Sequence, residues 1–301
     1  MRRPIAWGAL VLLVGCGASI TGSGASSDAA SGDDAASPPG GADAAFDAGP
    51  IGRWSTPGKV TPAATGSSED DVTLSSDALE LIFAVEATAG KDLYYTSRAS
   101  KSDPWQLPAT KLPFSASNTS EEAPRFSADD LTLYFASDRA GATTLDIYVV
   151  RRPARGSSMW SLPSRLDAVS SEQLVDKWFM PCSNDRYVMA QGPIGGATDL
   201  VEGIFGQGPP SVAQALSSDD NDTGPFLTQD CLTIYFASNR SGASLIYTSH
   251  RDAVTDPWPK PAPVLDFPIA GTSDGQEDPW LSPDGRTFAF ARNKDVYLST
   301  R

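Results

Sequence analysis

The chain has little histidine, cysteine or positive charge. Its 301 residues include one histidine and three cysteines, and 23 lysines and arginines face 37 aspartates and glutamates, which gives a net charge of -14. A single histidine excludes a multi-histidine zinc site, and three cysteines exclude a disulfide-dense scaffold. Because neutralising phosphates needs a basic face, the excess of acid also excludes nucleic acid as a partner.

Helical periodicity and membrane-spanning runs are also missing. The apolar stretch at residues 4–14 has 11 residues, whereas a membrane-spanning helix needs about 20. No segment keeps an apolar period of 3.6 residues, and 26 glycines and 24 prolines interrupt the chain. The sequence therefore predicts an all-β protein with frequent turns.

The first 16 residues have the order of a secretory signal. Two arginines precede the apolar run, which ends in Leu-Val-Gly-Cys at Cys16. This ending resembles the bacterial lipobox, in which the cysteine thiol is acylated and becomes the mature N-terminus. We expect residues 1–15 to be a lipoprotein signal peptide and Cys16 to carry the lipid, and an ordinary signal cut nearby is the alternative. Gly17, in place of aspartate, resembles the outer-membrane sorting pattern.

Residues 16–50 are predicted to be a tether. After the cysteine they are almost entirely glycine, alanine, serine, aspartate and proline, without lysine or arginine. Such a segment buries too little apolar surface to offset its ordering entropy, so we expect disorder. The lipid anchor and tether would hold the folded domain, residues 51–301, at a membrane of the cell envelope, on its periplasmic or surface side.

Residues 51–301 contain one motif in five copies. The two clearest copies are residues 122–139 (EAPRFSADDLTLYFASDR) and 223–240 (TGPFLTQDCLTIYFASNR). Weaker copies lie at residues 70–84 and 277–291, and a degenerate copy lies at residues 178–190. The turn aspartates of the copies are Asp77, Asp129, Asp185, Asp230 and Asp284. Their regular separation predicts five units of about 50 residues each.

Each unit predicts four strands. An apolar strand precedes the turn aspartate, an alternating aromatic strand follows it, a third strand carries Asp-Ile-Tyr or a variant, and a tryptophan opens the outer strand. Four strands in a unit of this length are typical of a β-propeller blade, which avoids long free sheet edges by radial closure. The predicted fold is a five-bladed β-propeller of four-stranded antiparallel blades.

The first and last segments of the repeat region are predicted to form one blade together. The fifth unit stops at Arg301, directly after its third strand, whereas residues 54–60 resemble an orphan outer strand and match residues 105–111. We expect residues 54–60 to add the outer strand to the blade built by residues 277–301. The N-terminal strand would thereby close the ring.

The repeats resemble the TolB-type propeller repeat, which is a WD-like repeat. The shared pattern is Ser-Pro-Asp-Gly, an aromatic strand, Ser-Asn/Asp-Arg-x-Gly and Asp-Ile-Tyr, and residues 122–152 and 223–251 match it most fully. The resemblance implies the fold, and by fold analogy a binding or scaffolding role toward an envelope protein or a glycan. TolB itself has an additional N-terminal domain for its envelope partners, so its own role is not implied here.

One mouth of the channel is predicted to be acidic. The loops that enter the inner strands meet the loops between second and third strands on one face, and most residues seven positions before the turn aspartates are acidic. The candidate ligand-binding residues are Asp70, Asp71, Glu122, Asp222, Glu277, Arg139 and Arg240. Two interpretations stay open. Either the arginines pair with the carboxylates and tie blades together, or unpaired carboxylates bind a metal ion, a cationic ligand or a sugar.

An enzymatic role is the alternative. Asp70, Glu122 and Glu277 around a five-bladed channel resemble the arrangement in glycoside hydrolases of this architecture, whose acid and base or nucleophile straddle the scissile bond. Because the acids recur at one repeat position, architecture is favoured over catalysis, and we assign no catalytic residue. A polysaccharide-acting hydrolase or lyase is the alternative function.

The remaining cysteines and one acidic loop carry smaller expectations. Cys182 and Cys231 lie near the same turn in adjacent units, so either a disulfide or two buried thiols is expected in an oxidising envelope. Residues 219–230 partly match a calcium loop but depart from it at the fifth and twelfth positions. We expect a polar loop between blades there, and we predict no metal or other cofactor.

Overall fold

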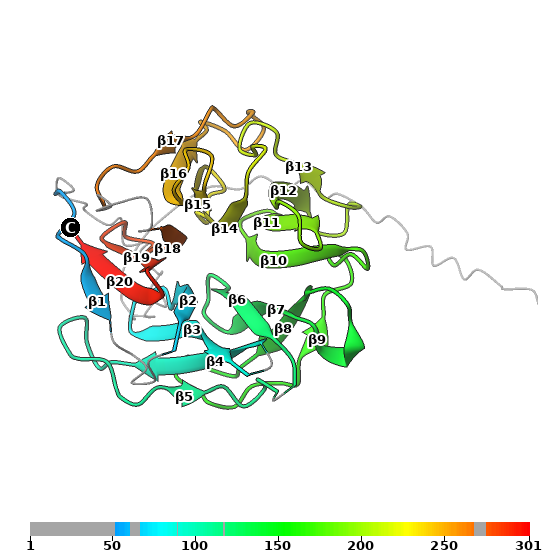
Figure 1. Cartoon of the computed structure of the whole chain (residues 1–301). Helices are drawn as coiled ribbons and strands as arrows, with labels where there is room; N and C mark the ends of the chain where they lie inside the picture. The colour runs from blue at the N-terminus through cyan, green and yellow to red at the C-terminus, as the bar shows by residue number, and fades with distance from the viewer. Residues whose placement is uncertain (1–51, 61–66, 89, 117, 268–274) are drawn as a thin grey trace, which may run out of the picture. The chain divides into compact units, whose positions relative to one another are not determined.

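The computed structural model describes residues 52–60, 67–88, 90–116, 118–267 and 275–301, which form a β-propeller. Five sheets of four antiparallel strands surround a central channel (Figure 1). The fold class predicted from the sequence is confirmed. The predicted signal peptide, Cys16 and the tether lie outside the described residues. Among the residues that are described, no helix is long and apolar enough to cross a membrane.

In blades 1 to 4 the strands follow chain order from the channel to the rim. Blade 1 consists of β2 (Glu69–Leu74), β3 (Glu80–Ala87), β4 (Gly90–Ser97) and β5 (Thr110–Lys111). Blade 2 consists of β6 (Glu121–Phe126), β7 (Thr132–Ser137), β8 (Asp146–Arg151) and β9 (Ser164–Arg165), with a 3₁₀ turn, η1 (Arg139–Gly141), before β8. Blade 3 consists of β10 (Leu174–Pro181), β11 (Arg186–Pro193), β12 (Asp199–Ile204) and β13 (Ser211–Val212). Blade 4 consists of β14 (Asp222–Leu227), β15 (Thr233–Ser238), β16 (Leu245–His250) and β17 (Ala262–Pro263).

Blade 5 takes its outer strand from the beginning of the domain. It consists of β18 (Gln276–Leu281), β19 (Thr287–Arg292), β20 (Asp295–Thr300) and β1 (Gly58–Val60). Strand β1 pairs antiparallel with β20, with Lys59 opposite Tyr297. The Ser55 amide also donates to the Thr300 carbonyl oxygen at 2.8 Å. The prediction that the N-terminal strand closes the ring is confirmed.

The turn aspartate makes the same two hydrogen bonds in four blades. In blade 1, Oδ1 of Asp77 accepts from the Ser75 hydroxyl at 2.6 Å and from the Leu79 amide at 3.0 Å. The same pair of bonds recurs at Asp129, Asp230 and Asp284. The residue after each of these aspartates has a positive φ, for example +58° at Ala78. Side-chain bonds thus hold the inner hairpin in a left-handed conformation that is unfavourable for a residue other than glycine.

An arginine from the end of the third strand covers each outer tryptophan in four blades. The guanidinium carbon lies between 4.0 and 5.0 Å from the indole centroid. The pairs are Arg98 with Trp105, Arg152 with Trp160, Arg251 with Trp258 and Arg301 with Trp54. The same arginines donate from Nε to the carbonyl of the residue after the turn aspartate. Cation–π contact and hydrogen bond together join the inner hairpin to the rim.

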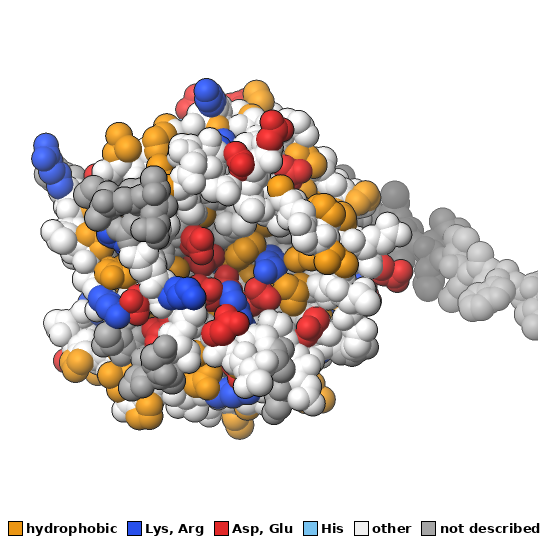
Figure 2. Space-filling model, viewed as in Figure 1, with side chains coloured by type: hydrophobic (Ala, Val, Ile, Leu, Met, Phe, Trp, Pro, Cys, Tyr) orange, Lys and Arg blue, Asp and Glu red, His pale blue; other side chains and the backbone are white. Residues whose placement is uncertain are grey.

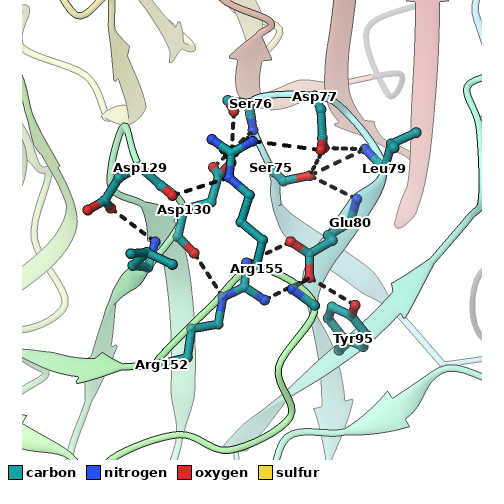
Figure 3. Close-up of polar contacts among 12 residues, drawn as sticks. Ser75, Ser76, Asp77, Leu79, Glu80, Tyr95, Asp129, Asp130, Arg152 and Arg155 are labelled. Carbon is teal, nitrogen blue, oxygen red and sulfur yellow. Dashed lines mark hydrogen bonds and ion pairs between the residues drawn. The ribbon is translucent and has the colours of Figure 1, made fainter. Parts of the chain in front are cut away.

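A buried polar network joins blades 1 and 2 (Figure 3). The side chain of Arg152 is fully buried and donates to both carboxylate oxygens of Glu80, at 2.7 and 2.6 Å. Nearby, Asp130 of blade 2 accepts from the amide and hydroxyl of Ser76 in blade 1. Moving one blade relative to the other would separate Arg152 from Glu80 and leave each charge buried without its partner, which is unfavourable. The network therefore holds these two blades in one relative position.

Cys182 and Cys231 form a disulfide between blades 3 and 4. Their Cα atoms are 5.6 Å apart, and they are separated by 49 positions in the sequence. In the chain-entropy model, closing a loop of this length destabilises the unfolded chain by about 4 kcal/mol. Of the two alternatives for these cysteines, the structure contains the disulfide.

Candidate functional site

Every inner strand has a β-bulge at the same repeat position. The pairing of inner and second strands slips there in all five blades. The bulged residues have φ between +53° and +57° and are Asp71, Ala123, Trp178, Gly224 and Asp278. A bulge re-aims side chains, and in blades 1, 3 and 5 both the bulged residue and the residue before it line the channel.

These bulges surround a cavity of about 500 Å³ at one end of the channel. The position before each bulge forms a ring of five side chains, Asp70, Glu122, Lys177, Thr223 and Glu277. Figure 2 shows red acidic and blue basic side chains gathered around the hollow at the centre of the molecule. Two lysines, Lys91 and Lys177, therefore lie in a mouth that sequence analysis expected to be acidic.

Blade 3 departs from the count of seven residues before the turn aspartate. That count leads from Asp185 to Trp178, but Trp178 occupies the bulge and Lys177 takes the ring position. The backbone bond that closes the turn runs from the Cys182 amide to the Arg186 carbonyl, whereas the turns of the other blades are one residue longer. Asp185 is the fourth residue of this shorter turn, whereas Asp77 is the third residue of its own turn, so the count from Asp185 begins one residue late and misses Lys177.

Lys91 joins three carboxylates from two blades. Its Nζ lies 2.7 Å from Oδ2 of Asp70, 3.1 Å from Oδ2 of Asp71 and 3.9 Å from Oε2 of Glu122. Burial disfavours the charged ammonium, but the three carboxylates outweigh burial and raise the pKa of Lys91 well above its usual range. Lys177 binds the same oxygen of Glu122 at 2.7 Å. The two lysines therefore neutralise the blade 1 and blade 2 side of the mouth.

The surroundings shift the pKa values of the adjacent Asp70 and Asp71 carboxyls in opposite directions. Burial and the charge of Asp71 raise the pKa of Asp70 to about 7. Burial also opposes the charge of Asp71, but Lys91 and Lys177 outweigh it and lower the pKa of Asp71. The indole Nε1 of Trp178 donates to Oδ1 of Asp71 at 3.0 Å. Near neutral pH, Asp71 is thus ionised, while Asp70 exchanges its proton readily.

Blade 5 contributes two cavity carboxylates, Glu277 and Asp278, that form no ion pair within the described residues. The side chain of Glu277 is exposed, and within the described part of the chain it forms no hydrogen bond or ion pair. Asp278 is 2% exposed, and its Oδ2 accepts from the Asp71 amide at 2.9 Å, but its buried Oδ1 has no hydrogen-bond partner. Oδ1 of Asp70 also lacks a partner. Burial, Asp71 and Glu277 together raise the pKa of Asp278 well above its usual value.

The structure places the seven predicted site residues in two groups. Asp70, Asp71, Glu122 and Glu277 line the cavity. The other three lie outside its lining and form ion pairs: Asp222 with Arg240, and Arg139 with Glu121 at 2.9 Å. Each of these arginines also donates to a main-chain carbonyl in the segment that enters its blade. Both arginines are thus paired with carboxylates, but each ion pair lies within a single blade and does not join two blades.

Arg125 closes the channel beneath the cavity. Its side chain is fully buried, and its guanidinium donates to the carbonyl of Val72 in blade 1 and to those of Gly224 and Pro225 in blade 4. A second cavity of about 370 Å³ lies at the other end of the channel, and its lining combines apolar side chains such as Trp280 with polar ones such as Asp130. The acidic cavity is therefore a pocket with a floor.

The described residues contain no group of three or more histidine, cysteine, aspartate or glutamate side chains placed to hold a metal ion. In the segment that partly matches a calcium loop, Asp222 pairs with Arg240. Oδ1 of Asp230 accepts from the Thr228 hydroxyl at 2.6 Å, as a turn aspartate does. Both aspartates thus have structural partners.

Replacing Asp70 with asparagine is expected to stabilise the propeller at about pH 8 and to change little at about pH 4. Folded Asp70, with a pKa of about 7, retains a proton that the unfolded chain releases near its ordinary pKa of 3.8. The stability of the wild-type protein therefore falls as the pH rises from about 4 through about 7, in total by about 4 kcal/mol. Urea unfolding of both proteins at the two pH values measures this difference.

The matched control for this prediction is Asp71→Asn. Its pKa is lowered, so the ionised carboxylate of Asp71 stabilises the fold. The control is expected to lose stability at about pH 8, which is the opposite sign. An Asp70→Asn protein whose stability differs from wild type by the same amount at both pH values would contradict the assignment of the raised pKa.

No protein-family model and no curated protein matches this sequence. Among solved structures, an alpha-L-arabinofuranosidase from Podospora anserina superposes with a TM-score of 0.55 at 14% identity, covering 83% of this chain and 96% of that chain. A putative TolB from Agrobacterium tumefaciens superposes with a TM-score of 0.49 at 18% identity, covering 76% of this chain and 71% of that chain. TolB from Acinetobacter baumannii has a TM-score of 0.48 at 13% identity, and the match covers 78% of this chain and 55% of that chain, about half its length. At such identities the likeness is one of fold, and the class defined is a five-bladed β-propeller with a charged pocket at one mouth.

Proposed function

We propose that this protein is a lipid-anchored protein of the bacterial cell envelope, and that its propeller is a binding or scaffolding module for an envelope protein or a glycan. The observation that carries the proposal is the contrast between two neighbouring positions of the inner strand. At the first residue of the inner strand, one position before the ring, Glu121 of blade 2 and Asp222 of blade 4 each form an ion pair with an arginine. At the cavity, Glu277 has no described partner and Oδ1 of Asp278 accepts no hydrogen bond.

Uncommitted carboxylates in a pocket favour ligand binding. A buried polar atom without a partner costs roughly 1 to 3 kcal/mol, and native proteins contain few of them. A bound molecule that brings N–H or O–H donors would supply the missing bonds. The rest of the pocket is held rigidly by the ion pairs of Lys91 and by the floor at Arg125. A rigid, concave site of this size suits recognition of a small ligand.

Affinity capture from envelope extracts tests the binding role. The mature wild-type protein is compared with Glu122→Ala and Glu277→Ala, and Glu172→Ala, an exposed glutamate outside the cavity, is the matched control. We expect a specific protein or glycan to be captured by wild type and control and lost from the two cavity variants. Equal capture by all four proteins would contradict a role for the cavity and direct attention to the opposite mouth.

A polysaccharide hydrolase is the second candidate, and one observation favours it. Asp70 and Asp71 have pKa values moved apart by their environments, as in acid and base pairs of catalytic sites. The test is the release of reducing sugars from plant and bacterial polysaccharides by wild type and by Asp70→Asn. Release that is lost in the variant would replace the binding role with catalysis, and no release from any substrate would leave binding as the function.

The lipid anchor is tested at Cys16. Cys16→Ser is expected to move the protein from the membrane fraction to the soluble fraction, because several acyl chains hold a domain stably on a bilayer and their loss leaves no anchor. Cell fractionation with immunoblotting measures this, and Ser19→Ala, which keeps the lipobox, is the control that should stay with the membrane. Membrane retention of Cys16→Ser would contradict the anchor.

A further inference from the structure

We infer that the acidic cavity binds a small ligand that carries a protonated primary amine, with the ammonium group held by Glu277, Asp278 and Asp70. The inference rests on the proposed binding function and adds the chemistry of the ligand. It follows from the distribution of charge in the cavity, from two buried oxygens without donors and from the way Lys91 already sits in the site.

Charge in the cavity is balanced on one side only. Lys91 contacts Asp70, Asp71 and Glu122, so the blade 1 and blade 2 side holds its own cation. Glu277 and Asp278, on the blade 5 side, also line the cavity, but neither forms an ion pair within the described residues. The charge of Arg125 acts on Asp278, and that of Lys91 on Glu277, at longer range. Burial raises the pKa of both carboxyls, and a ligand with a positive charge would lower those pKa values again, so a cation bound beside blade 5 favours their ionised form.

The unpartnered oxygens match the donors of an ammonium group. Asp278 is only 2% exposed to solvent, and its Oδ1 accepts no hydrogen bond. Oδ1 of Asp70 is buried and lacks a donor as well, and the exposed Glu277 adds a carboxylate without a hydrogen bond or ion pair among the described residues. A primary ammonium has three N–H donors and no acceptor, so it satisfies several carboxylates at once without adding an unpaired lone pair. Such charge-assisted hydrogen bonds are the stronger kind.

Other ligand chemistries fit less well. The described residues hold no group of three ligands with the geometry of a metal site. Trp178 is 8% exposed and its indole N–H is used by Asp71, so no free ring face is offered for stacking on a sugar. Lys91 Nζ, at 2.7 Å from Asp70, demonstrates that the site accommodates an ammonium nitrogen at hydrogen-bond distance.

The rest of the ligand has room to one side. A neighbouring cavity, also of about 500 Å³, shares Asp70 and Glu277 with the first. These two carboxylates thus lie where the cavities meet. An amine on an extended chain reaches them while its chain lies in the adjoining space.

Isothermal titration calorimetry of the mature full-length protein at about pH 7.5 tests the inference. The probes are cadaverine, its neutral isostere 1,5-pentanediol, and Nα-acetyl-lysine amide as the side-chain form of the same amine. We expect both amines to bind and the diol not to bind. Glu277→Gln and Asp278→Asn are each expected to weaken amine binding by about tenfold or more. Glu172→Gln, an exposed site outside the cavity, should bind as wild type does.

The outcomes separate the inference from the function on which it rests. Tighter binding of cadaverine supports a free amine as the ligand, and tighter binding of the lysine amide supports a lysine side chain of a partner. Binding of the diol equal to that of cadaverine, or undiminished amine binding by folded Glu277→Gln and Asp278→Asn, would overturn the inference. If the Glu277 variant loses an envelope partner while no amine binds, the inference fails and the proposed binding function stands.

Asp278→Asn keeps an oxygen that accepts from the Asp71 amide, so the variant is expected to fold. Thermal unfolding of each variant before titration verifies this. Glu277→Gln changes a side chain without a described partner and provides the test even if Asp278→Asn does not fold.

Discussion

Replacing Arg125 with alanine is expected to lower the free energy of unfolding by about 3 to 5 kcal/mol and the melting temperature by about 10 °C. The fully buried guanidinium donates to carbonyl oxygens of Val72, Gly224 and Pro225, which come from blades on different sides of the channel. Without it these buried carbonyls lose their donor, and the channel gains a void. Urea unfolding and differential scanning calorimetry measure the loss.

Two controls separate the hydrogen bonds from the volume. Arg125→Met fills most of the space without donors, so it should recover the part of the loss that comes from the void. Arg155→Ala removes an arginine whose side chain is 47% exposed and whose ion pairs contribute about 0 to 1 kcal/mol. An Arg125→Ala protein as stable as Arg155→Ala would contradict the view that Arg125 holds the blades together at the axis.

Deleting residues 52–60 is expected to lower the melting temperature by at least about 10 °C. Strand β1 covers the edge of β20, and Trp54 lies between Phe288, at 5.6 Å between ring centroids, and Arg301, at 4.1 Å. The deletion exposes the edge of β20 and part of the blade 5 core, which also favours aggregation. Scanning calorimetry and light scattering are the measurements.

The matched control is deletion of residues 17–50, the predicted tether, which should leave the unfolding transition unchanged. Trp54→Ala isolates the contribution of one ring and is expected to cost about 3 kcal/mol. If the protein without residues 52–60 unfolds at the wild-type temperature, the strand does not contribute to closing the ring.

The repeated motif carried most of the information about the fold. In four blades the turn aspartate makes its bonds within three residues of itself, as Asp77 does with Ser75 and Leu79, so the turn can be predicted from the local sequence. Closure was predictable because residues 54–60 match an outer strand and the fifth unit ends without one. The arginine that stacks on the rim tryptophan, such as Arg98, was not predicted because it follows the repeated Asp-Ile-Tyr part of the third strand.

The residues of the candidate site could be predicted only in blades whose turn aspartate is the third residue of its turn. Counting from the turn placed Asp70, Glu122 and Glu277 at the cavity, and the structure finds them in its lining. The count failed in blade 3, where Asp185 is one place later in its turn than the other turn aspartates and Lys177 takes the ring position. Lys91 could not be found in this way, because it lies near the start of β4 and has no counterpart in the repeat.

The sequence by itself determined the five blades, their four-stranded sheets and the closing strand, because these depend on local patterns that recur along the chain. Only the tertiary structure decided which carboxylates are neutralised and which are left without a partner. That outcome depends on distances between side chains of different blades: Lys91 of blade 1 reaches Glu122 of blade 2, and the Asp71 amide binds Asp278 of blade 5. The interaction energy of two charges across the channel depends on their distance and on their burial. Neither can be read from the sequence of a single blade.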